Sequence, residues 1–197
     1  MRVIAGQAKG KRLKAPPGMN TRPITDMIKE ALFNVLGDTV RDSSFLDLFA
    51  GSGSVGIEAL SRGAKQVVFI DNNSSAVGII KENIINCGFS KGFSVYRNDV
   101  FKALTLFDQR KTKFDLIYVD PPFTIEKIFD PVIYALDQSN ILERNGRIIL
   151  RTQRKKQLTA QLNYLEEYRT NNYGESVLHY YRMYEEVKPN DGNFQNT

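Results

Sequence analysis

Residues 45–56 read Phe45-Leu46-Asp47-Leu48-Phe49-Ala50-Gly51-Ser52-Gly53-Ser54-Val55-Gly56, and this stretch decides the fold of the chain. A short apolar run leads directly into three glycines spaced as G-x-G-x-x-G. In doubly wound α/β proteins this is how a buried strand turns into a helix beside a ligand. The pattern is weakly specific by itself, so its meaning depends on the rest of the 197 residues.

Short apolar runs and helical segments alternate along the rest of the chain, which is typical of a parallel sheet with crossover helices. We expect five such strands, at 45–49, 67–70, 93–97, 114–119 and 147–150. We expect the helices at 55–62, 74–87, 100–107, 126–137 and 155–162. Two further β-prone runs, 164–170 and 177–184, predict a closing antiparallel hairpin across Asn171-Asn172-Tyr173-Gly174. The expected fold class is α/β, with a mostly parallel sheet of seven strands.

The N-terminal region predicts a small β extension joined to one main domain. Residues 1–22 read as a basic, β-hairpin-like extension punctuated by Gly and Pro. Thr25 is a suitable N-cap for a following helix that Gly37 would end. The main domain is expected over 23–185, and the polar residues 186–197 are expected to be a disordered tail.

Composition restricts the class of protein. One cysteine and one histidine exclude a disulfide framework, and they leave no cluster with zinc-ligand spacing. No apolar stretch approaches the length of a membrane span, and the first residues lack the apolar core of a signal peptide. We therefore expect a reduced, cytoplasmic protein without a metal. No strong exposed apolar pattern requires a dimer, so a monomer is expected.

Basic residues are concentrated at the N-terminus. Residues 1–25 contain no acid but carry Arg2, Lys9, Lys11, Arg12, Lys14 and Arg22. Such a patch can neutralise phosphates and bind nucleic acid, and a solvated basic tail is the alternative. A second basic cluster at 151–156 is read as an exposed loop or helix start, with an RNA contact as the alternative.

Four acids each fall at the end of a successive expected strand: Asp47, Asp71, Asp99 and Asp120. The carboxyl edge is where an open α/β sheet binds its ligands. Asp99, taken alone, also fits the N-cap of the next helix.

Three cofactor classes fit a glycine-rich loop of this kind. A nucleoside triphosphate is excluded because the loop has no lysine for the phosphates. A dinucleotide would bring its pyrophosphate towards the carboxylate of Asp47, whereas S-adenosylmethionine carries an ammonium and a sulfonium that a carboxylate would attract. The residues predicted to bind S-adenosylmethionine are Asp47, Phe49, Ala50, Gly51, Ser52, Gly53, Gly56, Asp71, Asn72, Asn98, Asp99 and Val100.

Asp120-Pro121-Pro122-Phe123 follows the fourth apolar run directly. Consecutive prolines cannot donate backbone hydrogen bonds or continue a strand, so a carboxylate, carbonyl groups and an aromatic ring remain at the strand end. The exocyclic amine of a flat base offers the complementary N–H donors and stacking face. This run predicts a methyl-acceptor site of an amino methyltransferase, and a plain turn after a buried strand is the alternative.

Over residues 1 to about 184 the chain resembles the bacterial RsmD-type methyltransferases. The strings that carry the resemblance are Met1–Gly6, Gly10–Leu13, Thr21–Asp26, Lys29–Asn34, Asp47–Gly53, Gly56–Gly63, Asp120–Phe123 and Tyr173-Gly174. Asp-Pro-Pro-Phe is shared by many amino methyltransferases, whereas the N-terminal strings are specific to this family. The family pattern commonly has a basic residue where this chain has Met27. It often has an acid where this chain has Arg151.

The resemblance implies a Rossmann-like fold that uses S-adenosylmethionine to methylate guanine N2 of small-subunit 16S ribosomal RNA, during 30S assembly. It implies catalytic roles for Asp120, Pro121, Pro122 and Phe123. It adds Lys29 to the residues expected to bind RNA, which are then Arg2, Lys9, Lys11, Arg12, Lys14, Arg22 and Lys29.

Three other functions remain open from the residues alone. One is an adenine-N6 methyltransferase acting on DNA or RNA, although the chain lacks space for a separate DNA-reading domain. The second is a non-catalytic RNA-binding assembly factor that retains the fold. The third is a nicotinamide oxidoreductase.

Overall fold

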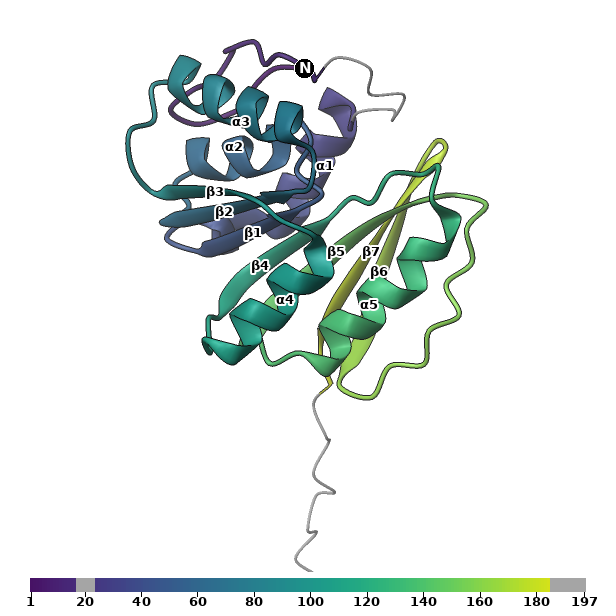
Figure 1. The fold of residues 1–197 in the computed structure, drawn as a ribbon. Coiled ribbons are helices and arrows are strands. Elements are labelled where there is room, and N and C mark those ends of the chain that lie inside the picture. The colour runs from purple at the N-terminus through teal and green to yellow at the C-terminus, as the bar shows by residue number, and fades with distance from the viewer. Residues whose placement is uncertain (17–23, 185–197) are drawn as a thin grey trace, which may run out of the picture.

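The computed structural model describes residues 1–16 and 24–184 of the chain. A single seven-stranded sheet has the order β3-β2-β1-β4-β5-β7-β6 (Figure 1). β1 to β5 pair in parallel, and β7 runs antiparallel to both of its neighbours, β5 and β6. The expected fold, a mostly parallel sheet closed by an antiparallel hairpin, is confirmed.

The strands are β1 (Ser44–Leu48), β2 (Gln66–Asp71), β3 (Phe93–Arg97), β4 (Phe114–Val119), β5 (Leu142–Gln153), β6 (Leu165–Tyr173) and β7 (Ser176–Met183). The α-helices are α1 (Asp26–Leu36), α2 (Ser54–Ser61), α3 (Ser74–Asn86), α4 (Val100–Gln109) and α5 (Phe129–Gln138). Two short 3₁₀ helices, η1 (Gly37–Val40) and η2 (Glu126–Ile128), follow α1 and precede α5.

Helices cover both faces of the sheet and bury one apolar cluster on each (Figure 1). Helices α1, α2 and α3 contribute to the first cluster, which contains Leu32, Ile57 and Ile80. Helices α4 and α5 contribute to the second, which contains Leu104 and Ile133. The strands are therefore buried on both sides, which explains their nearly continuous apolar runs.

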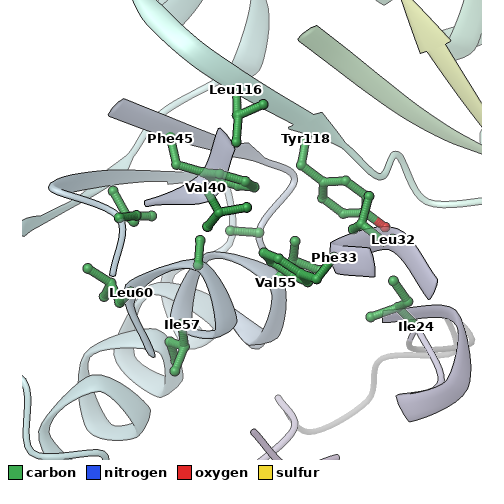
Figure 2. Packing of buried hydrophobic residues seen from close by; sticks show 14 of the residues in the cluster. Ile24, Leu32, Phe33, Val40, Phe45, Val55, Ile57, Leu60, Leu116 and Tyr118 are labelled. Carbon is green, nitrogen blue, oxygen red and sulfur yellow. The ribbon is translucent and has the colours of Figure 1, made fainter. Parts of the chain in front are cut away.

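The first cluster joins strands to helices from distant parts of the sequence (Figure 2). Figure 2 shows Phe45 and Leu116, from the paired strands β1 and β4, facing Phe33 of α1 and Val55 of α2. The Phe33 and Phe45 rings stack with centroids 6.5 Å apart. This packing fixes α1 over the first strands of the sheet.

The first helix begins and ends where the sequence predicts. The Thr25 hydroxyl accepts a hydrogen bond from the Ile28 amide at 3.3 Å, as an N-cap does. Gly37 follows the helix with φ 53°, a conformation in which a Cβ would be strained.

The N-terminal segment, residues 1–16, is folded back on itself and packs into the main core. Arg2 and Arg12 form an antiparallel bridge. Val3, Ala8 and Leu13 are buried in the first apolar cluster. The segment packs on the domain and contributes to its core.

Polar groups of α2 hold this segment in place. The Glu58 carboxylate is completely buried and accepts the Ile4 amide at 2.7 Å and the Ala5 amide at 3.0 Å. The Ser61 hydroxyl accepts the Ala8 amide at 2.9 Å. A Cβ at Gly6 would lie 1.7 Å from the Ser61 carbonyl oxygen, so this approach of two backbones requires glycine.

The prediction of a helix at 155–162 is wrong. No helix is present between β5 and β6, and the segment runs irregularly along α5. Its exposure alternates residue by residue, and Leu158, Ala160 and Leu162 pack against the second apolar cluster. This period of two is that of extended chain, whereas a helix buries one side chain in every three or four.

Two carboxylates of α5 bind the backbone amides of this segment. Asp130 accepts the amides of Thr159 and Ala160, and Asp137 accepts the Leu165 amide at 2.8 Å. These hydrogen bonds replace those that a helix would have made internally. Burial raises the pKa of both carboxyls, but the net direction is down: the Lys156 ammonium and the amides lower the pKa of Asp130, and the amides lower that of Asp137.

Three element boundaries also differ from expectation. β5 begins at Leu142 and ends at Gln153, so it extends beyond 147–150 in both directions. The helix expected at 126–137 is split into η2 and α5. β6 continues through Tyr173, so the hairpin turns at residues 174–175 rather than across the two asparagines.

Within residues 1–16 and 24–184, no helix is both long enough and apolar enough to cross a membrane. The tail expected at 186–197 lies outside the described residues.

Candidate active site

A cavity of about 340 Å³ lies at the carboxyl edge of the parallel strands. Its size is in the range of small-molecule sites. Its wall contains the whole of the Asp120–Phe123 run and nine of the predicted cofactor residues: Asp47, Phe49, Ala50, Gly51, Ser52, Asp71, Asn72, Asp99 and Val100. Strand order therefore brings both predicted groups to one place.

Gly53, Gly56 and Asn98 are not part of the cavity wall. A Cβ at Gly56 would lie 2.3 Å from the Phe69 ring, so this glycine allows α2 to pack on β2. Gly53 precedes α2 with φ 74° and serves as its N-cap. Asn98 donates its amide to the Asp71 carbonyl at the end of β2. These three residues shape the loops around the cavity.

Asp71 organises the glycine loop. Its Oδ2 accepts the Gly51 amide at 2.8 Å, and its Oδ1 accepts the Asn73 amide at 2.9 Å. Phe49, at the start of the loop, has φ 59°, which is uncommon for a residue with a side chain. The strained turn lies in the cavity wall, where such conformations concentrate.

Asp47 lies at the floor of the cavity and is 1% exposed. Its Oδ2 accepts the Gly56 amide at 2.9 Å. Burial raises the pKa of Asp47 well above its ordinary value, and the nearby carboxylates of Asp120 and Asp71 act in the same direction. A cation bound in the cavity would favour the charged form of this carboxyl.

Asp99 is both a helix N-cap and a residue of the cavity wall, the two roles that its sequence position allows. Its Oδ1 accepts the Lys102 amide at 3.1 Å, so it is the N-cap of α4. It also lines the cavity together with Val100 and Phe101.

The Asp120 carboxylate is held from two sides. Its Oδ2 accepts the Tyr118 hydroxyl at 3.2 Å and the Nη1 of Arg151 at 3.0 Å. Burial raises the pKa of Asp120, and the guanidinium and the phenol oppose this shift. Burial also raises the pKa of Tyr118 well above its ordinary value, so the phenol keeps the proton that it donates.

The rest of the Asp120–Phe123 run forms a turn. The Pro122 carbonyl accepts the Ile125 amide at 3.0 Å. In the described parts of the chain no backbone hydrogen bond reaches the Pro121 carbonyl. The Phe123 ring lies 6.3 Å from that of Phe129, centroid to centroid. The run is therefore a turn and also presents acceptors and a ring to the cavity.

Four polar residues of the cavity wall, Ser54, Asn73, Tyr118 and Arg151, were missed as site residues from the sequence. Tyr118 stands in an apolar strand, where it reads as core. Arg151 follows Ile148-Ile149-Leu150 directly and is 2% exposed. A charge at the end of a buried strand needs a partner, and this signal could have suggested a pairing with one of the strand-end acids.

Most of the predicted RNA-binding residues are exposed and lie on the N-terminal segment, called here the basic N-terminal surface. Arg2, Lys9, Lys11, Arg12 and Lys14 are exposed on the N-terminal segment, whose Met1, Ala15 and Pro16 line the cavity. Arg22 lies outside the described residues.

Lys29 does not join this surface. It is 1% exposed, its Nζ donates to the Arg2 carbonyl at 2.6 Å, and it lies 3.3 Å from Glu58 Oε2. Burial lowers the pKa of Lys29, and the Glu58 carboxylate opposes this shift. Since a buried ammonium cannot reach a phosphate on the surface, we leave Lys29 out of the proposed RNA surface.

The family described as Conserved hypothetical protein 95 matches residues 1–182. The chain belongs to this family. Membership confirms the RsmD-type resemblance that the sequence carries. YlbH of Bacillus subtilis is 40% identical over 174 residues, covering 88% of this chain and 94% of the relative. Ribosomal RNA small subunit methyltransferase D of Haemophilus influenzae is 34% identical over 164 residues, covering 83% and 84%.

A solved methyltransferase-like structure has the same fold. yhhF from Escherichia coli superposes with a TM-score of 0.81 at 27% identity, covering 93% of this chain and 97% of that one. The fold is that of the S-adenosylmethionine-dependent methyltransferases, and the predicted cofactor is the one that this fold uses.

The residues present fit this cofactor. Asp71 at the tip of β2 suits a ribose diol, and the region around Asp99 and Val100 suits an adenine. Asp47 and Asp120 would become charged beside a cationic ligand and would repel a pyrophosphate, although burial raises the pKa of both carboxyls. The glycine loop lets the backbone approach the ligand closely.

Proposed function

We propose that the protein transfers a methyl group from S-adenosylmethionine to the exocyclic N2 of a guanine in small-subunit 16S ribosomal RNA, as a monomer acting during 30S assembly. One observation carries the chemical part of the proposal: the Asp120–Phe123 run opens into the same cavity as the glycine loop. The name of the Haemophilus influenzae relative supports the ribosomal substrate, and the family resemblance supports guanine N2.

The acceptor side of the cavity complements an amine on a flat base. The Asp120 carboxylate and the Pro121 carbonyl would accept its two N–H groups, which draws the lone pair out of conjugation with the ring. Phe123 would stack on the base once it is turned out of its helix. Stacking of a base on an aromatic side chain contributes about 1–3 kcal/mol.

S-adenosylmethionine supplies an electrophilic methyl group when it is bound. In the transfer a bond from the amine nitrogen to the methyl carbon forms, the bond from that carbon to sulfur breaks, and the nitrogen then loses one proton. Asp120 or water would take this proton. Because the transfer moves one positive charge from sulfur to nitrogen and the proton leaves only afterwards, holding the two reactants in line contributes most, and no histidine base is needed.

The basic N-terminal surface would bind the RNA backbone beside the cavity. Arg2 and Lys14 each have a carboxylate partner on the surface, at 3.2 Å and 2.9 Å. The side chains of Lys9, Lys11 and Arg12 make no ion pair with any residue in 1–16 or 24–184. These three side chains are therefore available for phosphates.

Changing Lys11 and Arg12 to alanine together is expected to weaken RNA binding at every sequence tested. The slope of log affinity against log salt should fall by about two, because each side chain would neutralise one phosphate. Titrations of RNA at several salt concentrations measure this slope. The matched control is Lys65→Ala with Lys91→Ala, which removes the same charge from exposed positions outside both the N-terminal segment and the cavity wall. If both double variants have the parental slope, the N-terminal surface does not bind RNA.

Mapping the methylated nucleotide tests the function itself. Ribosomal RNA from cells with and without this protein would be compared, and then incubated with the purified protein and labelled cofactor. The expected product is a single N2-methylguanine in small-subunit RNA, made on an assembly intermediate more readily than on naked RNA. Methyl transfer to adenine would support the adenine-N6 alternative. Cofactor binding without transfer to any RNA would support the non-catalytic assembly factor.

A further inference from the structure

Arg151 is the residue of the cavity wall that departs from the family pattern, and its side chain contacts Asp120, Ser176 and Phe123 there. Nη1 donates to Asp120 Oδ2 at 3.0 Å. Nε and Nη2 donate to the Ser176 hydroxyl at 3.3 Å and 3.2 Å. Cζ lies 4.9 Å from the centroid of the Phe123 ring. One guanidinium therefore touches the proposed amine acceptor and the proposed stacking ring together.

We propose that Arg151 is a positioning residue for the methyl transfer, which holds Oδ2 of Asp120 and the plane of Phe123 so that Asp120 Oδ1 and the ring face the acceptor base. The planar, always charged guanidinium suits this task, because it can bind a carboxylate along its edge while its face lies on an aromatic ring. The proposal rests on the proposed function, since it assumes that Asp120 accepts the amine.

The sheet supplies the rigidity that positioning needs. Arg151 is in β5, Asp120 follows the neighbouring β4, and Ser176 begins the antiparallel β7. The Arg151 side chain is 3% exposed and that of Asp120 is 19% exposed, so the pair is largely protected from solvent. Such a pair is held more firmly than one on the surface.

Charge is the second part of the proposal. The groups that face Asp120 are Arg151 from β5, Tyr118 from β4 and the buried Asp47 from β1. Arg151 is the cation of this set, and it lowers the pKa of Asp120 against burial. If Asp120 were protonated on Oδ1, that oxygen would donate a hydrogen bond where the amine needs an acceptor. Arg151 opposes this protonation and so keeps Oδ1 as an acceptor.

The test compares Arg151→Gln, Arg151→Lys and the control Arg144→Gln, which lies at the far end of β5 and is exposed. Methyl transfer is followed in single turnovers with saturating cofactor, at pH values upward from the ordinary aspartate pKa of about 3.9. Without the guanidinium the pKa of Asp120 rises, so Arg151→Gln should lose roughly ten- to hundredfold in rate at neutral pH. It should recover part of that loss as the pH is raised.

Arg151→Lys keeps the positive charge that Arg151→Gln removes, but it lacks the planar guanidinium. It should therefore regain the pH profile of the parent while remaining slower, because Phe123 is no longer held. Arg144→Gln should match the parent throughout. A constant loss for Arg151→Gln at every pH, or no loss at all, would overturn the positioning role.

A second measurement needs no RNA. The carboxyl carbon of Asp120 is followed by NMR as the pH changes, with Asp120→Asn to assign the signal. Its titration should move to higher pH in Arg151→Gln and return in Arg151→Lys, and an unmoved titration would overturn the proposal. If the methyl group is found on another base, or on none, the proposed function fails, whereas this titration still reports on Arg151.

Discussion

Asp120→Ala is expected to abolish methyl transfer while binding of S-adenosylmethionine is retained. The change removes the carboxylate that would accept the substrate amine, and it leaves the glycine loop and Asp71 in place. Loss of one preorganised hydrogen-bond partner at a reacting centre costs about 10²–10³-fold in rate. Single-turnover transfer to ribosomal RNA measures the rate, and calorimetric titration measures cofactor binding.

Two controls separate chemistry from folding. Asp38→Ala removes an exposed acid outside the cavity and should leave the rate unchanged. Thermal unfolding of Asp120→Ala shows whether the variant is folded, since it leaves the Arg151 guanidinium without its carboxylate. A folded Asp120→Ala that transfers methyl groups at the parental rate would exclude the proposed role of Asp120.

Glu58→Ala is expected to destabilise the protein by about 3–5 kcal/mol, because it leaves the buried Lys29 ammonium without its carboxylate. The same change removes the acceptor for the Ile4 and Ala5 amides and the ion pair with Arg62 at 2.8 Å. The N-terminal segment should then detach more easily from α2. Denaturant unfolding measures the free energy, and proteolysis of the first residues measures the detachment.

A double variant distinguishes charge from packing. Adding Lys29→Met to Glu58→Ala removes the isolated charge, so the double variant should be more stable than the Glu58→Ala single variant. The matched surface control is Glu30→Ala on the exposed side of α1, which should change stability by less than about 0.5 kcal/mol. If Glu58→Ala is no less stable than Glu30→Ala, the buried cluster does not secure the N-terminal segment.

Local patterns predicted most of the fold. The alternation of apolar runs and helical segments placed β1 to β4 within a residue or two and gave α1 with its Thr25 cap. The segment at 155–162 was misread because Lys155 to Leu162 contains good helix formers, although its apolar side chains recur every second residue. Tertiary packing against α5 overrode that propensity.

Some residues of the candidate site could be predicted from local sequence, and others could not. Strand-end acids and glycines could be located because the carboxyl ends of parallel strands meet at one edge, whatever the details of packing. Lys29 could not be distinguished from its exposed basic neighbours, since its burial depends on Glu58, which is 29 residues further along the chain.

By itself the sequence determined the α/β fold, the edge that binds a ligand and the Asp120–Phe123 run, because each depends on residue types within a short window. Tertiary structure alone decided that Arg151 pairs with Asp120 and that Glu58 holds the N-terminal segment. Those interactions join residues 31 and more than 50 positions apart. They depend on strand order and register, which no local window of sequence contains.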